Sequence, residues 1–276
     1  MKSVAEILPL STQYLQERNI PNARRLVEEL LGHLFKCKRI QVYMQFDRPI
    51  VEAELVTLRD WLRRLAKHEP LEYIIGEVEF FGGVFHTDSR ALIPRPETEL
   101  LVEMIAKSMK DQESLWDICT GTGCIGISLK RKFPNLFVSL SDLSMDALSL
   151  AKENALGLHV EFCYGDLFAP FEGRKADMIV CNPPYVTAKE FLTLDASVRD
   201  YEPTMALVGG ESGLEFYERL AQEAPSYLNP KGQLILEIGA SQGKKIFEIF
   251  SKPVWSRKEL VQDLASKDRF FFLEIQ

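Results

Sequence analysis

The segment Asn182-Pro183-Pro184-Tyr185 follows the apolar run 178–181, which is typical of a buried strand. Its two prolines fix φ and end the strand, and a residue before proline is held extended, so this backbone is stiff. The side-chain oxygen of Asn182 and a proline carbonyl are therefore held in place at the carboxyl end of a strand. Two such acceptors could bind both protons of a planar NH2 group and stabilise positive charge that develops on its nitrogen.

The aromatic ring of Tyr185 fits the same chemistry. It can pack on a planar amide or adenine amino group and attract the nitrogen as that nitrogen becomes cationic. The reaction would then depend on positioning and electrostatics rather than on a general base. A proline-rich turn after a strand is the purely structural alternative. We favour an acceptor site, because the segment follows the fourth strand of a predicted sheet whose first strand carries a glycine loop.

The glycine loop follows a predicted strand and opens a helix, and its glycines are spaced as Gly121-x-Gly123-x-x-Gly126. Glycines let a backbone turn tightly and approach a bulky ligand without a Cβ clash. Taken literally, the spacing is the dinucleotide fingerprint, and Asp142 closes the next strand 19 residues after Gly123, where a ribose-binding acid is expected. A nicotinamide-dependent oxidoreductase therefore remains an alternative.

Asp117 argues for a different cofactor. It lies four residues before Gly121, at the end of the first strand of the predicted sheet. An acid at this position suits a cofactor with a cationic amino-acid tail better than one with a pyrophosphate. S-adenosylmethionine carries an ammonium and a sulfonium and no phosphate. The loop therefore favours a methyltransferase over a dehydrogenase.

The elements that must position these two motifs alternate along the C-terminal part of the chain. Short apolar strands alternating with helices predict an α/β fold, with a mainly parallel sheet and helices on both faces. Ligands bind at the carboxyl ends of such strands, near the topological switch point. Strands are predicted at 115–119, 136–141, 160–164, 177–181, 233–238 and 270–275. Helices are predicted at 97–108, 124–132, 145–155, 213–227 and 244–250.

The N-terminal part has a different pattern. Apolar residues at helical spacing predict a small all-helical domain over residues 1–70. Residues 73–83 predict a β-hairpin or paired strands with glycine turns, and they lie in a linker at 71–95. The catalytic domain then covers residues 96–276. The chain is thus expected to have two domains joined by a hairpin.

Charge and composition restrict the class of protein. Residues 1–70 hold 12 Lys/Arg against 9 Asp/Glu, whereas residues 71–276 hold 21 against 31, a net charge of −10. Such an acidic body is poorly suited to phosphate backbones, so no stable nucleic-acid binding is expected. The sequence has no apolar run of ~18 to 20 residues and no signal peptide, which predicts a cytoplasmic protein without membrane association. Five scattered cysteines and four separated histidines predict neither disulfides nor a metal site. A monomer is expected.

Several segments resemble the S-adenosylmethionine-dependent glutamine methyltransferases of bacterial peptide chain release factors. Asn-Pro-Pro-Tyr alone is shared with amino-group methyltransferases that act on DNA adenine or on protein glutamine. Its combination with the proline-rich segment Arg95–Glu99 is much more specific than the glycine loop. The resemblance covers about residues 69–240 by motif, while the N-terminal domain matches only in kind. The resembling segments are 69–76, 92–99, 117–126, 182–185 and 202–207, with Gly209, Gly210 and Gly213.

The resemblance implies a class I methyltransferase-like, Rossmann-like fold with an N-terminal helical domain that grips a protein substrate. It implies methyl transfer from S-adenosylmethionine to a side-chain amide nitrogen. The amide would be that of the glutamine in the Gly-Gly-Gln motif of release factors. S-adenosylhomocysteine would be the product, and no metal would take part.

The resemblance also implies site residues at the matching positions. Asp142 would bind the ribose hydroxyls, while Asp166 and Leu167 would bound the adenine. Asn182 would contact both the cofactor and the substrate amide, and would be catalytic with Pro183 and Tyr185. The methionine part of the cofactor would be bound by Cys119, Thr120, Gly121, Thr122 and Gly123. The acceptor pocket would be completed by Pro183, Pro184 and Tyr185. The family usually has glycine at position 119, and the cysteine side chain narrows the loop in this chain.

Other functions remain open at this point. A glutamine of a ribosomal protein is the nearest alternative substrate, because the motifs separate the two poorly. A DNA or RNA adenine methyltransferase would share the acceptor pocket, but the chain has no basic, aromatic-rich recognition insert. An oxidoreductase leaves the Asn-Pro-Pro-Tyr segment unexplained, and only Cys119 favours a non-catalytic binding module. The roles of Arg95 and Glu97 stay open between the site and a helix N-terminus. The segment 202–213 is either a lid or a connection.

Overall fold

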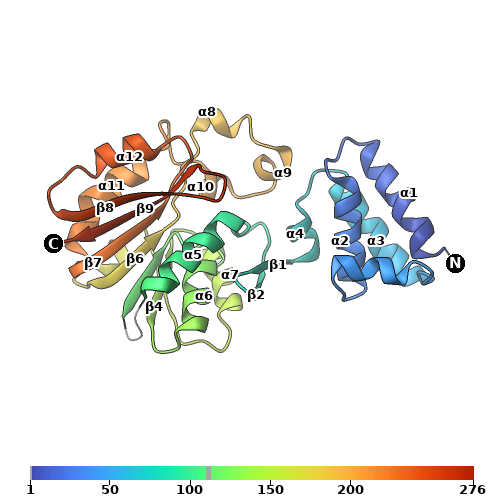
Figure 1. Ribbon diagram of the computed structural model, residues 1–276, viewed down its shortest axis with the longest axis horizontal. Coiled ribbons are helices and arrows are strands. Elements are labelled where there is room, and N and C mark those ends of the chain that lie inside the picture. The colour runs from blue at the N-terminus through green and yellow to red at the C-terminus, as the bar shows by residue number, and fades with distance from the viewer. Residues whose placement is uncertain (1, 110–112) are drawn as a thin grey trace. The chain divides into compact units, whose positions relative to one another are not determined.

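A computed structural model describes residues 2–109 and 113–276 of the 276-residue chain. Contacts divide the chain into two compact units (Figure 1). One unit holds the chain up to Gly76 together with Ala196–Tyr201, and the other holds Glu77–Asp195 and Glu202–Gln276. Within residues 2–109 and 113–276, no helix is long and apolar enough to cross a membrane.

The first unit is helical, as the periodicity predicts. Its apolar residues recur every three or four positions, so each helix buries one stripe in a common core that includes Leu15, Leu30 and Leu58. Ser3 begins the first helix with a capping box, in which the Ser3 amide donates to Glu6 Oε2 at 2.8 Å. The helices are α1 Val4–Gln16, α2 Ala23–Leu34, η1 Arg39–Gln45, α3 Glu52–Leu65, α4 Leu71–Ile75 and α9 Ala196–Arg199.

The predicted start of the hairpin is wrong. Residues 73–75 lie in helix α4, which follows Pro70 and ends at Gly76 with a φ of +80°. The hairpin itself is shorter and pairs β1 Glu77–Phe80 with β2 Gly83–His86 in antiparallel register. An apolar run this short does not distinguish a helical turn from a strand, and here the buried Tyr73 and Ile74 pack as a helix.

The second unit contains a seven-stranded sheet with the order β5-β4-β3-β6-β7-β9-β8. The pairs from β5 to β7 are parallel, whereas β9 runs antiparallel to both of its neighbours. This arrangement confirms the predicted fold class. The strands are β3 Ser114–Ile118, β4 Phe137–Asp142, β5 Glu161–Tyr164, β6 Ala176–Cys181, β7 Leu228–Glu237, β8 Trp255–Gln262 and β9 Asp268–Ile275.

Helices cover both faces of this sheet, because each central strand buries side chains on both sides. Leu115 of β3 packs with α5, α6 and α7, while its neighbour Trp116 packs with α11 and α12. The long helices are α5 Pro96–Ser108, α6 Cys124–Lys132, α7 Met145–Asn154, α11 Glu215–Glu223 and α12 Gly243–Ile249. Shorter helical segments are η2 Ala169–Phe171, α8 Ala188–Phe191, α10 Thr204–Leu207 and η3 Ala224–Ser226.

The sequence analysis missed strand β8 and extended one helix too far. The helix predicted at 213–227 ends at Glu223, and the 3-10 turn η3 follows it. Strand β8 lies at the sheet edge and is mostly exposed or half-buried. Its sequence therefore lacks the apolar run that marks the central strands.

The strand order places both chemical motifs at one point of the sheet. The chain enters the seven-stranded sheet at β3, forms β4 and β5 on one side of it, and returns to β6 on the other side of β3. Residues Ile118 and Cys181 are opposite each other in the parallel register of β3 and β6. The glycine loop and the Asn182–Tyr185 segment therefore leave the sheet side by side at its topological switch point.

Candidate active site

A pocket opens at the carboxyl ends of β3, β4 and β6, and its lining comes from the second unit alone. The lining includes most of the residues predicted for the cofactor. These are Cys119, Thr120, Gly121, Thr122, Asp142, Asp166, Leu167 and Asn182. Gly123, Pro183 and Tyr185 do not line it, whereas Pro184 does. The structure thus gathers the two motifs around one cavity.

The glycine loop depends on backbone conformations that other residues rarely adopt. Gly121 has a φ of +55° and Gly123, which precedes α6, has a φ of +82°. A Cβ on Gly126 would lie 2.4 Å from the side chain of Leu140, so this third glycine lets α6 pack closely on β4. Only the first two glycines shape the loop, and the third serves helix–strand packing.

Asp117 supports the loop from behind instead of facing the pocket. Its carboxylate is buried, and Oδ2 accepts hydrogen bonds from the Thr120 hydroxyl at 2.7 Å and the Gly126 amide at 2.9 Å. Burial raises the pKa of Asp117 to about 7, and these two hydrogen bonds oppose the rise. Asp117 does not line the pocket, and its contact with a cationic cofactor tail stays a prediction.

Cys119 has a φ of +58°, in the left-handed region that favours glycine. This conformation explains why a glycine suits the position, and it means that the cysteine is held there at a cost in strain. Cys119 lines the pocket, and burial together with the neighbouring Cys119 thiol raises the pKa of the buried Cys181. The loop thus keeps its shape despite the substitution.

Asp142 lies at the end of β4 and connects two loops. Its Oδ2 accepts from the Gly121 amide at 2.9 Å, and its Oδ1 accepts from the Ser144 amide at 2.9 Å. Burial raises the pKa of this carboxyl. Asp166 is exposed and pairs with Arg219 at 2.9 Å, and the next residue, Leu167, is buried with a φ of +44°. The acidic Asp142 and the apolar Leu167 therefore lie at or just beyond the carboxyl ends of the neighbouring strands β4 and β5.

The Asn182–Tyr185 segment is held by a loop far away in sequence. The amide of Val186 donates to the Leu207 carbonyl at 2.9 Å, and the amide of Gly209 donates back to the Val186 carbonyl at 2.9 Å. A Cβ on Gly209 would lie 2.2 Å from the Pro184 carbonyl oxygen. The glycine thus lets two backbones pack closely, and the Pro184 carbonyl faces Gly209.

The same loop reaches the other side of the pocket through Glu202. This buried carboxylate accepts from Arg95 Nη2 at 2.5 Å and from the Ile93 amide at 3.1 Å. Arg95, Pro203, Met205 and Ala206 line the pocket. Arg95 is therefore a pocket residue fixed by an ion pair, and the segment 202–207 forms part of the pocket wall.

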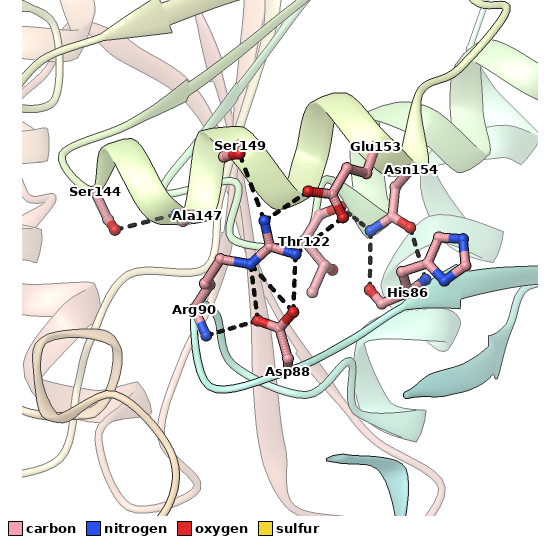
Figure 2. Close-up of polar contacts among 9 residues, drawn as sticks. All are labelled: His86, Asp88, Arg90, Thr122, Ser144, Ala147, Ser149, Glu153 and Asn154. Atoms are coloured by element: carbon pink, nitrogen blue, oxygen red, sulfur yellow. Dashed lines mark hydrogen bonds and ion pairs between the residues drawn. The ribbon is translucent and has the colours of Figure 1, made fainter. Parts of the chain in front are cut away.

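A second polar network supports the glycine loop from the side of α7 (Figure 2). Asn154 is buried, and its Nδ2 donates to the carbonyls of Thr122 and His86, both at 3.0 Å. Arg90, which lines the pocket, is fixed by Asp88 at 2.8 Å and by Glu153 at 2.6 Å. This network ties the chain after β2 to α7 and to the loop.

Sequence reasoning also missed the buried acid Glu237 at the end of β7. Its Oε2 accepts from the Thr98 hydroxyl at 2.7 Å. Burial raises the pKa of Glu237 to about 7, while the Thr98 hydrogen bond and the neighbouring Arg269 and Asn182 side chains lower it. No spacing rule connects residues 98, 182 and 237, so the sequence alone holds no signal for this cluster.

Comparison with known proteins identifies the family. A family described as PrmC N-terminal domain matches residues 6–76, and one described as methyltransferase small domain matches residues 84–197. A protein named release factor glutamine methyltransferase from Chlamydia trachomatis serovar D is 40% identical, over 98% of this chain and 94% of its own length. The chain belongs to the release factor glutamine methyltransferase family. A Bacillus cereus member is 36% identical over 99% of each chain.

Solved structures agree with this family at the level of the fold. A methyltransferase from Pyrococcus furiosus has a TM-score of 0.52 at 18% identity, over 69% of this chain and 87% of its own. An E. cuniculi complex described as responsible for the methylation of the eRF1 translation termination factor has a TM-score of 0.50 at 19% identity. That match covers 68% of this chain and 99% of the other. The predicted family and class I methyltransferase fold are confirmed.

Proposed function

We propose that this member of the family transfers a methyl group from S-adenosylmethionine to the side-chain amide nitrogen of a glutamine. The acceptor is the glutamine of the Gly-Gly-Gln motif in bacterial peptide chain release factors, and the product is S-adenosylhomocysteine. The observation that carries the proposal is the meeting of the glycine loop and Asn182 at one pocket on the switch point. The family relatives' names support the choice of substrate.

The residues of the pocket fit this cofactor. Around Gly121 an ideal Cβ would meet only Ala91, at 3.9 Å, so the loop leaves open space on the pocket side. Asp142 offers carboxylate oxygens that suit two ribose hydroxyls, and the apolar Leu167 suits an adenine ring. Bound there, the cofactor supplies an electrophilic methyl carbon. In the described residues no cluster of three or more His, Cys, Asp or Glu side chains could hold a metal ion.

The acceptor segment orients the amide nitrogen. In our proposal Asn182 Oδ1 and the Pro183 carbonyl accept the two protons of the glutamine amide, since the Pro184 carbonyl faces Gly209. Acceptors fixed in advance stabilise positive charge on that nitrogen without reorganising. The ring of Tyr185 is mostly buried, and burial raises its pKa to about 12, so it stays neutral and acts by packing. The methylated nitrogen then releases one proton to solvent.

The helical unit would bind the protein substrate, as proposed for residues 1–70. Residues 1–70 hold 12 Lys/Arg against 9 Asp/Glu, whereas the rest of the chain is acidic. This difference supports a separate surface for contact with the protein substrate. We expect a chain lacking residues 1–70 to bind the cofactor but to methylate release factor poorly. Equal methylation by the truncated chain would give that domain another role. We further propose that the protein is cytoplasmic and monomeric. Analytical ultracentrifugation would test the monomeric state.

A labelling experiment tests the reaction. The purified protein is incubated with methyl-labelled S-adenosylmethionine and a bacterial release factor, the release factor with its motif glutamine changed to alanine, or duplex DNA. Label that appears on the release factor and disappears in the alanine variant would support the proposal. Label on both release factors would move the acceptor to another residue. Label on DNA would instead indicate adenine methylation.

A further inference from the structure

A buried cluster behind the pocket holds the side chain of Asn182. Cys181 pairs with Leu236 in the parallel register of β6 and β7, so the next residues, Asn182 and Glu237, are neighbours. Cys181 and Leu236 both pack in the core on the α11 side. Because side chains alternate along a strand, Asn182 and Glu237 point to the opposite side, toward α5. Thr98 of α5 meets Glu237 there.

The hydrogen bonds of this cluster have a fixed direction. An ionised carboxylate only accepts hydrogen bonds. Glu237 Oε2 accepts from the Thr98 hydroxyl at 2.7 Å, and Asn182, its neighbour in the register of β6 and β7, lowers the pKa of the same carboxylate as a hydrogen-bond donor does. A hydrogen bond between Asn182 and the ionised Glu237 has to be donated by Asn182 Nδ2. Such a bond would leave Asn182 Oδ1 free for the pocket, which Asn182 lines.

We propose that Glu237 is a positioning residue for methyl transfer, which turns the Asn182 oxygen toward the acceptor amide by accepting a hydrogen bond from Asn182 Nδ2. The inference rests on the proposed function. A flipped Asn182 would present its NH2 group to the NH2 group of the substrate, and two donors would face each other. Glu237 is only 2% exposed and does not line the pocket, so it acts through Asn182.

Ionising the buried Glu237 costs free energy of folding, which an uncharged side chain at this position would not. Burial raises its pKa to about 7, and Glu97 of α5 adds to the rise. Arg269 of β9 opposes it, together with Thr98 and Asn182. Tyr185, Tyr217 of α11 and Cys124 of α6 also interact electrostatically with this carboxyl, and burial raises the pKa of each, so none of them ionises near pH 7.

The raised pKa gives the sign of the pH dependence. Protonated Glu237 carries a hydroxyl that can donate a hydrogen bond to Asn182 Oδ1. It would then compete with the substrate amide for that oxygen. The rate at saturating substrates should therefore fall as pH drops through about 7. Because the folded state binds the proton more tightly than the unfolded one, Glu237 costs the fold stability as pH rises from 4.5 to about 7, and the full cost remains above that pH. An uncharged isostere should thus keep or raise stability while it lowers activity.

Glu237→Gln is the main test, with Asp177→Asn as the matched acid-to-amide control. Asp177 lies at the opposite end of β6, where its carboxylate accepts from the Ser114 amide at 2.9 Å and from Asn229 Nδ2 at 2.8 Å. We measure kcat, the KM for release factor, the cofactor Kd and the melting temperature. Glu237→Gln should lower kcat at least tenfold, leave KM and Kd within threefold, and keep the melting temperature. Asp177→Asn should lower the melting temperature and keep kcat.

Thr98→Val provides a second variant that retains the carboxylate. The Thr98 hydrogen bond lowers the pKa of Glu237, so its loss should move the acid limb of the kcat profile to higher pH. The limb should disappear in Glu237→Gln. Burial also raises the pKa of Asp117 to about 7, and Asp117 is unchanged in both variants. A change of the acid limb in these variants therefore cannot come from titration of the glycine loop.

The outcomes separate this inference from the proposed function. A wild-type protein that does not methylate release factor would overturn both. An active wild type with a Glu237→Gln kcat within twofold would overturn the positioning role alone. So would a Glu237→Gln variant whose kcat, cofactor binding and melting temperature fall together, or a Thr98→Val profile that does not move.

Discussion

The two loops that meet at the pocket are held in different ways. The glycine loop after β3 is shaped by its own residues, through positive φ angles at Gly121 and Gly123 and the bonds from Thr120 and Gly126 to Asp117. The Asn182–Tyr185 segment after β6 is stiff because of its prolines, but its supports come from distant parts of the chain. One loop carries its conformation locally, and the other depends on tertiary packing.

This difference matters for function. The glycine loop has to approach a cofactor, so it needs backbone freedom more than a particular side chain. In the proposed reaction the acceptor segment has to direct an amide oxygen and a carbonyl at one nitrogen, so it needs outside contacts that fix its orientation. Gly209 and Glu237 supply such contacts from two different elements. Changes at the two loops should therefore affect different kinetic constants.

Asn182→Ala should have the largest effect. It removes the side-chain acceptor and leaves the two prolines and the loop intact. We expect kcat to fall about 10²- to 10³-fold, the loss typical when one preorganised hydrogen-bonding group is removed from a reacting centre. The melting temperature should change little. Single-turnover methylation of release factor measures the rate, and near-normal activity would refute the acceptor role of Asn182.

Gly209→Ala should have the next largest effect. The added Cβ would lie 2.2 Å from the Pro184 carbonyl oxygen and 3.0 Å from Tyr185 Cα, so backbone must move. A shift of about 1 Å in a positioned group can lower the rate about 10²-fold, and we expect kcat to fall by that order while the cofactor Kd is unchanged.

Gly173→Ala is the control for this change. Gly173 has a φ of +74°, and no described atom lies within 4 Å of its ideal Cβ. Its substitution should lower the melting temperature without changing kcat. If Gly209→Ala keeps a normal kcat, the distant loop does not determine the position of the acceptor segment.

The contrast between the loops also explains what the sequence could predict. Alternating strands and helices, the glycine spacing and the two prolines act locally, and they predicted the fold and both motifs. The supports of Asn182 join residues 98, 182 and 237, which only the folded sheet brings together. The spacing of Asp117 suggested a cofactor contact, but spacing does not determine the direction of a side chain. Helix α4 was missed because its apolar run is short, and edge strand β8 was missed because its exposed residues form no apolar run.

Gly123→Ala should separate cofactor binding from acceptor positioning. Its φ of +82° strains any L side chain, and the added Cβ would lie 2.5 Å from Ile127 Cδ1. Left-handed strain costs about 1–3 kcal/mol, so we expect the cofactor Kd to rise about tenfold, which corresponds to ~1.4 kcal/mol. At saturating cofactor kcat should stay within threefold. Calorimetric titration measures Kd, and a loss of kcat with unchanged Kd would contradict the division between the loops.

Cys119→Gly should have the smallest effect, and it tests whether the glycine loop tolerates a side chain through strain alone. Cys119 has a φ of +58°, so glycine should relieve strain, whereas Cys119→Ala keeps the strain and also removes the thiol that meets Cys181. We expect the glycine variant to exceed the alanine variant in free energy of unfolding by about 1 kcal/mol. Both should bind the cofactor within threefold of wild type. Urea denaturation measures the difference. A glycine variant less stable than the alanine variant would mean that the unfolded chain's added freedom outweighs the relieved strain, and that the loop is held by its neighbours rather than by its own backbone preferences.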